Sequence, residues 1–249
     1  MTETVSQHVI AGAVLSMPVR IRKAVQHAAM FSVDAEAAQR LIDYSGLRVC
    51  RYLPGRALVV LTVMDYIDGD LGRYHEYATN VMVDPPGVDH APGSWSPRGL
   101  RSAGAFCHHM PVDQPFTLEA GITIWGYPKV MADFTIRDGR QFGFDLSIDG
   151  RDVLGMEFEP GLPIPSSFTS AEQVRPTYSY RDGVVRETEG AMRLSGVRYR
   201  PGGARLRLSD HPYANDLASL GLPKRALVSS SAENVEMTFA DPHEITGEK

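Results

Sequence analysis

Short alternating segments that end in Asp-Gly pairs constrain the fold of this chain most. Gln141–Ile148 alternates apolar and polar residues and runs into Asp149-Gly150, and similar segments run into Asp138-Gly139 and Asp182-Gly183. Alternation with a period of two predicts a strand with one buried face. An Asp-Gly pair between two strands is typical of a tight hairpin turn. The sequence therefore predicts a sheet built largely from antiparallel neighbours.

The remainder of the chain extends this pattern and adds few helices. Apolar residues at helical spacing predict a helix over 32–42, with Ser32 as its cap, and a second over 213–221 that ends at glycine. A short helix is expected within 112–121. We expect an α+β fold, a mostly antiparallel barrel or sandwich with helices packed outside, and one domain over residues 1–249. Further strands are expected at 17–27, 47–52, 57–64, 73–83, 104–110, 132–137, 153–158, 177–180, 192–199, 204–209, 225–231 and 234–239.

Composition limits the partners and the compartment. The formal net charge is −5, and no basic run occurs, which argues against nucleic-acid and membrane partners. The longest aliphatic stretch, Ala57–Met64, is far shorter than the roughly 20 residues that span a bilayer. The first residues do not have the pattern of a signal peptide. Cys50 and Cys107 are predicted to be reduced core thiols, so we expect a cytoplasmic protein.

One lysine stands in an unusual setting. The chain has 25 basic residues, of which only Lys23, Lys129, Lys224 and Lys249 are lysines. Lys129 follows a proline inside the apolar and aromatic run Ile122–Ala132. An amine can lose its proton and act as a nucleophile when it is desolvated, whereas a guanidinium cannot. The alternative is a lysine at a strand end whose aliphatic chain is packed and whose ammonium group is exposed to solvent.

Other polar residues were weighed as candidate site residues. His108 and His109 are adjacent, so on a regular strand they would point to opposite faces and could not share a metal ion without a bulge. We therefore expect no metal site, and we interpret His108 as a polar core or pocket residue. The sequence has no glycine-rich phosphate loop and no dinucleotide motif, and we expect no cofactor. Ser229–Ser231 has no nucleophile-elbow glycines. Glu76, taken alone, has the pattern of a solvated acid on an outward face.

Four segments together resemble the acetoacetate decarboxylase family. These are Asp70–Glu76, Gly121–Lys129 with its Tyr-Pro-Lys sequence, Arg205–His211 and Leu222–Ser231. They occur in the order and at the spacing of that family from about residue 30 to about residue 240. The resemblance implies a closed β-barrel with flanking helices that forms homo-oligomers.

The resemblance also implies roles for individual residues. Lys129 matches the amine that forms a Schiff base with a substrate ketone. In that family the lysine is activated by desolvation or by a neighbouring cation. Glu76 matches the active-site glutamate and would stabilise the iminium or transfer a proton. We expect Tyr127, Trp125, His108 and Arg22 to contact a small oxo-acid substrate. Trp125, Tyr127 and Met131 would supply the desolvation.

This chain also departs from the family pattern. Val130 stands where the decarboxylase proper has a second lysine, and Gly121-Ile122-Thr123 replaces Gly-Arg-Glu. A second pocket glutamate would fall near Leu61. Arg20 and Arg22 are the candidates for the arginine that meets the substrate carboxylate. These departures change the expected substrate more than the amine chemistry.

Three functions remain open from the sequence. The first is a Schiff-base lyase that decarboxylates a β-oxo acid or a related oxo acid through an enamine. The second is an aldolase, dehydratase or cyclase that uses the same imine on pyruvate-like substrates. The third is a non-catalytic barrel that binds a small ligand.

Overall fold

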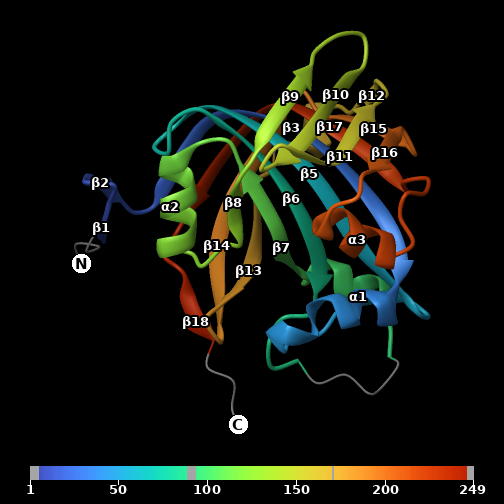
Figure 1. The fold of residues 1–249 in the computed structure, drawn as a ribbon. Coiled ribbons are helices and arrows are strands. Elements are labelled where there is room, and N and C mark those ends of the chain that lie inside the picture. The colour runs from blue at the N-terminus through green and yellow to red at the C-terminus, as the bar shows by residue number, and fades with distance from the viewer. Residues whose placement is uncertain (1–5, 89–93, 170, 246–249) are drawn as a thin grey trace.

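The structure is a computed structural model, and it describes residues 6–88, 94–169 and 171–245. Within these residues, seven strands close into a β-barrel (Figure 1). Their order around the barrel is β17-β3-β5-β6-β7-β13-β14, and β14 pairs again with β17. β7 and β13 run parallel, and the other neighbours are antiparallel. The expected barrel is thus confirmed, with one parallel pairing. The strands are β3 (Val19–Asp34), β5 (Arg56–Gly69), β6 (Tyr74–Val83), β7 (Gly104–Val112), β13 (Gln173–Arg181), β14 (Val184–Ser195) and β17 (Val228–Phe239).

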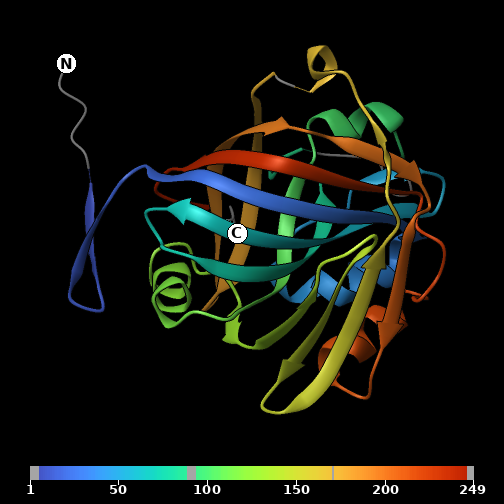
Figure 2. The same ribbon diagram turned by 90° about the horizontal axis from the view of Figure 1, so that it is seen from above.

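A second sheet of four strands packs across the outside of the barrel (Figure 2). Alternation along β5 explains the contact, because Leu61 and Val63 belong to the apolar layer between the sheets while Thr62 and Met64 face the barrel interior. His27 of β3 stacks on Phe142 of the outer sheet with ring centroids 3.8 Å apart. The outer sheet runs in the order β16-β11-β10-β9, with β9 (Asp133–Arg137), β10 (Phe142–Ile148), β11 (Arg151–Phe158) and β16 (Ala204–Leu208).

Three α-helices flank the strands in the described residues (Figure 1): α1 (Ala35–Ile42), α2 (Pro115–Thr123) and α3 (Pro212–Ser219). The side chain of Asp34 caps α1 by accepting a hydrogen bond from the Ala37 amide at 2.8 Å. Ser32, expected as the cap, instead lies in β3 and accepts a hydrogen bond from the Tyr52 hydroxyl. No helix in this part of the chain is both long and apolar enough to cross a membrane.

Smaller elements complete the fold. β4 (Arg51–Leu53) pairs with β5, and β8 (Lys129–Met131) pairs parallel with β7. Residues 84–100 are rich in proline and glycine, which predicts an irregular excursion, and they lie partly outside the described residues. Near their end, η2 (Pro97–Arg101) packs near β4 and does not line the barrel cavity. The other elements are β1 (Gln7–Ile10), β2 (Ala13–Ser16), β12 (Leu162–Pro163), β15 (Arg198–Pro201), β18 (His243–Ile245), η1 (Asp43–Ser45) and η3 (Ser166–Phe168).

Candidate active site

A cavity of about 200 Å³ lies inside the barrel, and Lys129 is one of the residues that line it. Three larger hollows, of about 460, 570 and 740 Å³, also lie among the described residues, and several charged side chains line each of them. The barrel cavity has the character expected of a small-molecule site, because its walls are mostly apolar and its polar groups are few and convergent.

A turn after α2 brings the chain to the wall of the cavity. Gly126 adopts a positive φ of 64°, and the Tyr127 amide donates a hydrogen bond to the Gly121 carbonyl at 3.0 Å. This turn brings β8 back beneath α2, so that the Lys129 side chain lies against Gly121. A Cβ atom at Gly121 would lie only 2.5 Å from Cδ of Lys129. The position therefore requires glycine if the lysine is to keep this path.

Lys129 is buried, and its amine has two polar partners. The residue is 7% exposed, Nζ lies 2.8 Å from Oε2 of Glu76, and it donates a hydrogen bond to Oγ1 of Thr117 at 2.8 Å. Nζ also lies 5.2 Å from the centre of the Tyr74 ring. The alternative of a packed stem with a wet head does not describe this lysine, because its head is enclosed.

Glu76 faces the cavity rather than solvent. Alternation along β6 directs Tyr74, Glu76, Ala78 and Asn80 into the barrel, and Glu76 is 7% exposed. Its Oε1 accepts a hydrogen bond from the Tyr66 hydroxyl at 3.0 Å. Burial, together with the Glu76 charge, raises the pKa of Tyr66 and that of Tyr74 well above the ordinary value. Both phenols therefore stay protonated at neutral pH.

The cavity walls carry few other polar groups. Among the described lining residues, Lys129 is the one cation and Glu76 the one carboxylate. Gln26, Thr62, Asn80 and Thr177 contribute neutral polar groups, and aliphatic, aromatic and sulfur-containing side chains form most of the remaining wall. A charged pair in such surroundings is poorly screened, so its electrostatic effects are stronger than they would be in water.

The two aromatic residues predicted to contact substrate both line the cavity. Trp125 is 3% exposed, and its indole N–H donates to the Ala240 carbonyl at 2.9 Å. The Tyr127 hydroxyl pairs with Oγ1 of Thr177 at 2.8 Å. Met131, expected to help desolvate the amine, is 41% exposed and lies outside the cavity. Val130 points outward and packs against the apolar layer between the two sheets.

Arg22 lies outside the cavity, contrary to the expectation that it would contact substrate. Its guanidinium is exposed and pairs with Asp68 at 2.8 Å and with Asp70 at 2.6 Å. Along this part of β3 the buried positions are Val19 and Ile21. Arg20 and Arg22 alternate with them and therefore point outward. The inward residue of β3 at the cavity is Gln26.

His108 also lies outside the cavity, because β7 contains a bulge. Thr79 of β6 is opposite His109, whereas its neighbour Asn80 is opposite Cys107, which leaves His108 as an extra residue. Cys107 and Met110 consequently both face the cavity although they are three positions apart. The two histidines share the outer face, and the expectation that they point to opposite faces is wrong.

Sequence reasoning missed several residues at the site. Tyr66, Tyr74 and Asn80 could have been found from the alternation along β5 and β6 once Glu76 was placed inward. Thr117 gives no such signal, because it lies on α2 and reaches Lys129 only through the return of the chain after Gly126.

The family model described as acetoacetate decarboxylase matches residues 13–243. A search of curated protein sequences finds no match. Among solved structures, an acetoacetate decarboxylase from Legionella pneumophila is 15% identical, with 99% of this chain and 92% of that chain covered and a TM-score of 0.68.

Two further structures have the same fold. One comes from structural studies of acetoacetate decarboxylase and is 18% identical in sequence. The match covers 92% of this chain and 89% of that chain, with a TM-score of 0.62. The other is MppR, an enduracididine biosynthesis enzyme in complex with pyruvate; it is 17% identical, covers 95% and 93%, and has a TM-score of 0.59. The match over residues 13–243 places the chain in a family: it belongs to the acetoacetate decarboxylase family.

Proposed function

We propose that this protein is a carbon–carbon lyase that binds an oxo acid as an imine on Lys129 and releases carbon dioxide through an enamine. The observation that carries the proposal is the enclosed Lys129 amine, 2.8 Å from the Glu76 carboxylate, at the wall of the barrel cavity. An amine and a carboxylate in contact inside an apolar cavity can act as nucleophile and proton acceptor.

Imine formation needs a neutral amine. Glu76 is positioned to take a proton from the Lys129 ammonium, because Oε2 lies at hydrogen-bond distance from Nζ. The neutral amine attacks the substrate carbonyl carbon, and the hydroxyl of the resulting carbinolamine takes the proton from Glu76 and leaves as water to give the iminium. The Thr117 hydroxyl, 2.8 Å from Nζ, orients the nitrogen during this step.

The iminium then accepts the electron pair of the bond between the α-carbon and the carboxylate. Carbon dioxide leaves and an enamine remains, so the step removes both the positive charge on nitrogen and the negative charge on the substrate. Glu76 then takes up a proton from solvent and delivers it to the enamine carbon, which restores the iminium, and addition of water releases the ketone and the Lys129 amine. The Tyr66 hydroxyl, hydrogen-bonded to Glu76 at 3.0 Å, holds that carboxyl group in place.

The lining of the cavity favours a small oxo acid with an apolar substituent. No arginine is among the described lining residues, so the carboxylate meets neutral donors such as the Gln26 and Asn80 amides. A carboxylate that lacks a cationic partner in an apolar cavity is poorly stabilised, and loss of carbon dioxide relieves this cost.

A second candidate keeps the imine but not the decarboxylation. MppR is described in complex with pyruvate and with the condensation product of pyruvate and imidazole 4-carboxaldehyde. An aldolase, dehydratase or cyclase acting on pyruvate-like substrates would use the same amine. The third candidate, a non-catalytic barrel that binds a small ligand, would bind an oxo acid without forming the imine.

Trapping the imine tests the proposal. Wild-type protein is incubated separately with acetoacetate, a longer 3-oxo acid and pyruvate, reduced with borohydride and mapped by peptide mass spectrometry. We expect the reduced adduct on Lys129, its absence in Lys129→Met, and its retention in the control Lys23→Met, whose lysine is exposed.

Product analysis separates the candidates. Carbon dioxide release from a 3-oxo acid that disappears in Lys129→Met supports the decarboxylase. An adduct with pyruvate and no carbon dioxide from any 3-oxo acid supports the aldolase group. Binding of an oxo acid by calorimetry with no adduct on Lys129 refutes both and leaves the binding barrel.

A further inference from the structure

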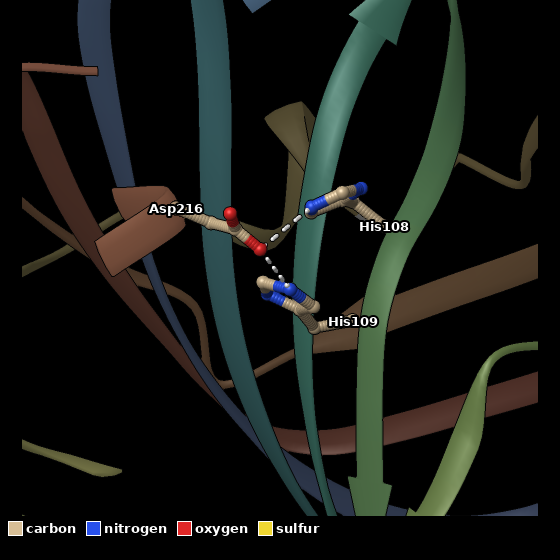
Figure 3. A group of neighbouring side chains, drawn as sticks. All are labelled: His108, His109 and Asp216. Atoms are coloured by element: carbon tan, nitrogen blue, oxygen red, sulfur yellow. Dashed lines mark hydrogen bonds and ion pairs between the residues drawn. The ribbon is translucent and has the colours of Figure 1, made fainter. Parts of the chain in front are cut away.

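The bulge in β7 assembles a side-chain cluster on the outer face of the barrel, which we call the His-His-Asp cluster: His108, His109 and Asp216. Nε2 of His109 lies 2.9 Å from Oδ2 of Asp216, and Nε2 of His108 lies 3.3 Å from the same oxygen. Figure 3 shows both rings directed at this carboxylate. In the described part of the chain this is the one group of three histidine, cysteine or acidic residues whose ligand atoms lie within 4.8 Å of one another.

The cluster joins two elements that are far apart in the sequence. The histidines are consecutive on β7, and Asp216 lies on α3, more than 100 residues later. Two adjacent strand residues ordinarily point to opposite faces, and the extra residue in β7 is what turns both rings toward α3.

Neighbouring side chains orient both rings. Nδ1 of His108 lies 2.9 Å from the Tyr44 hydroxyl. The His109 ring stacks on Tyr213 with centroids 3.8 Å apart and an interplanar angle of 13°. His109 is 4% exposed, and its Nδ1 is a buried polar atom with no hydrogen-bond partner among the described groups. Contacts within the protein therefore leave the bonding capacity of this ring incompletely used.

We propose that the His-His-Asp cluster binds a divalent transition-metal ion of the zinc type through the two Nε2 atoms and Oδ2 of Asp216. Imidazole and carboxylate ligands suit such ions, and zinc lies about 2.0–2.2 Å from each. Tetrahedral ligands at that distance are roughly 3.4 Å from one another, so separations of 2.9 and 3.3 Å need only a small expansion.

Proton positions can adjust without a change in charge on the rings. When no ion is bound, each Nε2–H donates to Asp216. When Nε2 binds the ion, the proton of each neutral ring sits on Nδ1, and that of His108 can be donated to the Tyr44 oxygen. For His108 this matches the general arrangement in which the second nitrogen of a metal-bound histidine is fixed by a hydrogen bond, whereas stacking on Tyr213 holds the His109 ring.

The ion would fasten α3 to the barrel wall, at a place separate from the imine site. Asp216 is the exposed member of the cluster, with a side chain 40% exposed, whereas the side chains of His108 and His109 are 9% and 5% exposed. None of the three residues lines the cavity of Lys129. Three protein ligands leave a fourth position for water on the solvent side.

Metal titration of the full chain tests the site. Protein dialysed against a chelator is titrated with Zn²⁺ by calorimetry and with Co²⁺ by visible absorption. We expect one ion per chain and a cobalt spectrum typical of four- or five-coordinate nitrogen and oxygen ligation. Asp216→Asn keeps the size of the side chain and an acceptor oxygen for the histidine N–H groups, yet loses the anionic ligand.

The variants separate ligands from neighbours. We expect Asp216→Asn and His109→Asn to weaken zinc binding by more than about 100-fold, and Tyr44→Phe by about 10-fold, as for loss of an outer-shell partner. His243→Asn, which removes an exposed histidine of β18, leaves the affinity unchanged. The Lys129→Met variant also binds zinc as the wild type does.

Pulsed electron paramagnetic resonance of Cu²⁺-loaded wild-type protein gives a readout that does not depend on the folding of any variant. Two coordinated imidazoles support the proposal, and none or one overturns it. The proposal also fails if the wild type takes up no Zn²⁺, in which case the cluster is a hydrogen-bonded contact between α3 and β7 only. Equal zinc binding by wild type, Asp216→Asn and His109→Asn would place the ion elsewhere.

Discussion

Removing the Lys129 amine tests how much the buried ion pair between Lys129 and Glu76 contributes to stability. Lys129→Met keeps a long unbranched side chain but leaves the Glu76 carboxylate without its cationic partner. Breaking a buried ion pair by removing one member typically costs about 3–5 kcal/mol of folding stability. The Tyr66 hydroxyl, at 3.0 Å, stays as a donor to Glu76 and reduces that cost.

The unpaired Glu76 carboxylate can avoid the free-energy cost of a buried charge by binding a proton. For a glutamate side chain in water, protonation at pH 7 costs about 4 kcal/mol, since its reference pKa is about 4.3. The destabilisation by Lys129→Met is therefore limited to about 4 kcal/mol at pH 7. It shrinks by about 1.4 kcal/mol for each unit that the pH falls toward that reference value, because the folded variant then holds one proton that the unfolded chain lacks.

Urea unfolding followed by tryptophan fluorescence measures this, and Trp125 lies at the same cavity. We expect Lys129→Met to lose about 3–4 kcal/mol at pH 7 and about 1–2 kcal/mol at pH 5.5. Lys129→Met combined with Glu76→Gln recovers most of the loss at pH 7, because the buried charge is gone. The exposed control Lys23→Met changes stability by less than about 0.5 kcal/mol. A loss that is independent of pH, or that the second substitution does not relieve, would refute the ion-pair reasoning and indicate a packing effect.

Two further predictions concern the surroundings of the site. Gly121→Ala places a Cβ 2.5 Å from Cδ of Lys129. We expect imine trapping to fall at least about 10-fold, because the nucleophile is displaced, and the free energy of unfolding to fall by about 1–3 kcal/mol. In the control Gly139→Ala the nearest atom to the new Cβ is 3.9 Å away, and imine trapping stays unchanged. Trapping at the wild-type level in Gly121→Ala would contradict the path described for the lysine. Burial lowers the pKa of His27 to about 4, below the usual 6.5, so its contribution to stability is full above pH 6.5 and is lost as the pH falls toward 4, by about 3 kcal/mol. Stability curves of wild type and His27→Phe between pH 7.5 and 4 should diverge by that amount on acidification, and parallel curves would show that His27 binds its proton equally well in both states.

Local chemistry made the hairpins predictable. Asp149, Gly150, Asp182 and Gly183 all adopt positive φ, as expected for two-residue turns between paired strands. The turn at Asp138-Gly139 is different: β9 ends at Arg137 and β10 begins at Phe142, so the connection is longer, and Gly139 keeps an ordinary φ. The same dipeptide thus indicated a hairpin each time, but it did not fix the length of the turn.

Pairing over long distances accounts for the parts of strands that the sequence did not predict. β3 continues through Ser32 to Asp34 because it lies between β5 and β17, and its hydrogen-bond partners on β5 extend as far as Arg56. Likewise, β5 continues through the polar residues after Asp65 to Gly69, because β3 pairs with it there. In both places tertiary pairing outweighed local propensity. Sequence reasoning placed Lys129 and Glu76 together only through the family resemblance, since the two residues lie 53 positions apart on strands that do not pair.

The bulge in β7 connects the two sites of the molecule. The extra residue, His108, changes the phase of the strand, so that Met110 faces the cavity with Cys107 while both histidines face α3. β8 pairs with this shifted part of β7, and Lys129 lies opposite Met110. A strand without the extra residue would turn Met110 outward and carry the pairing of β8 with it. The position of the Lys129 amine thus depends on a histidine that does not line the cavity. A contact between that histidine and α3, with or without an ion, stabilises the register on which the proposed imine site depends.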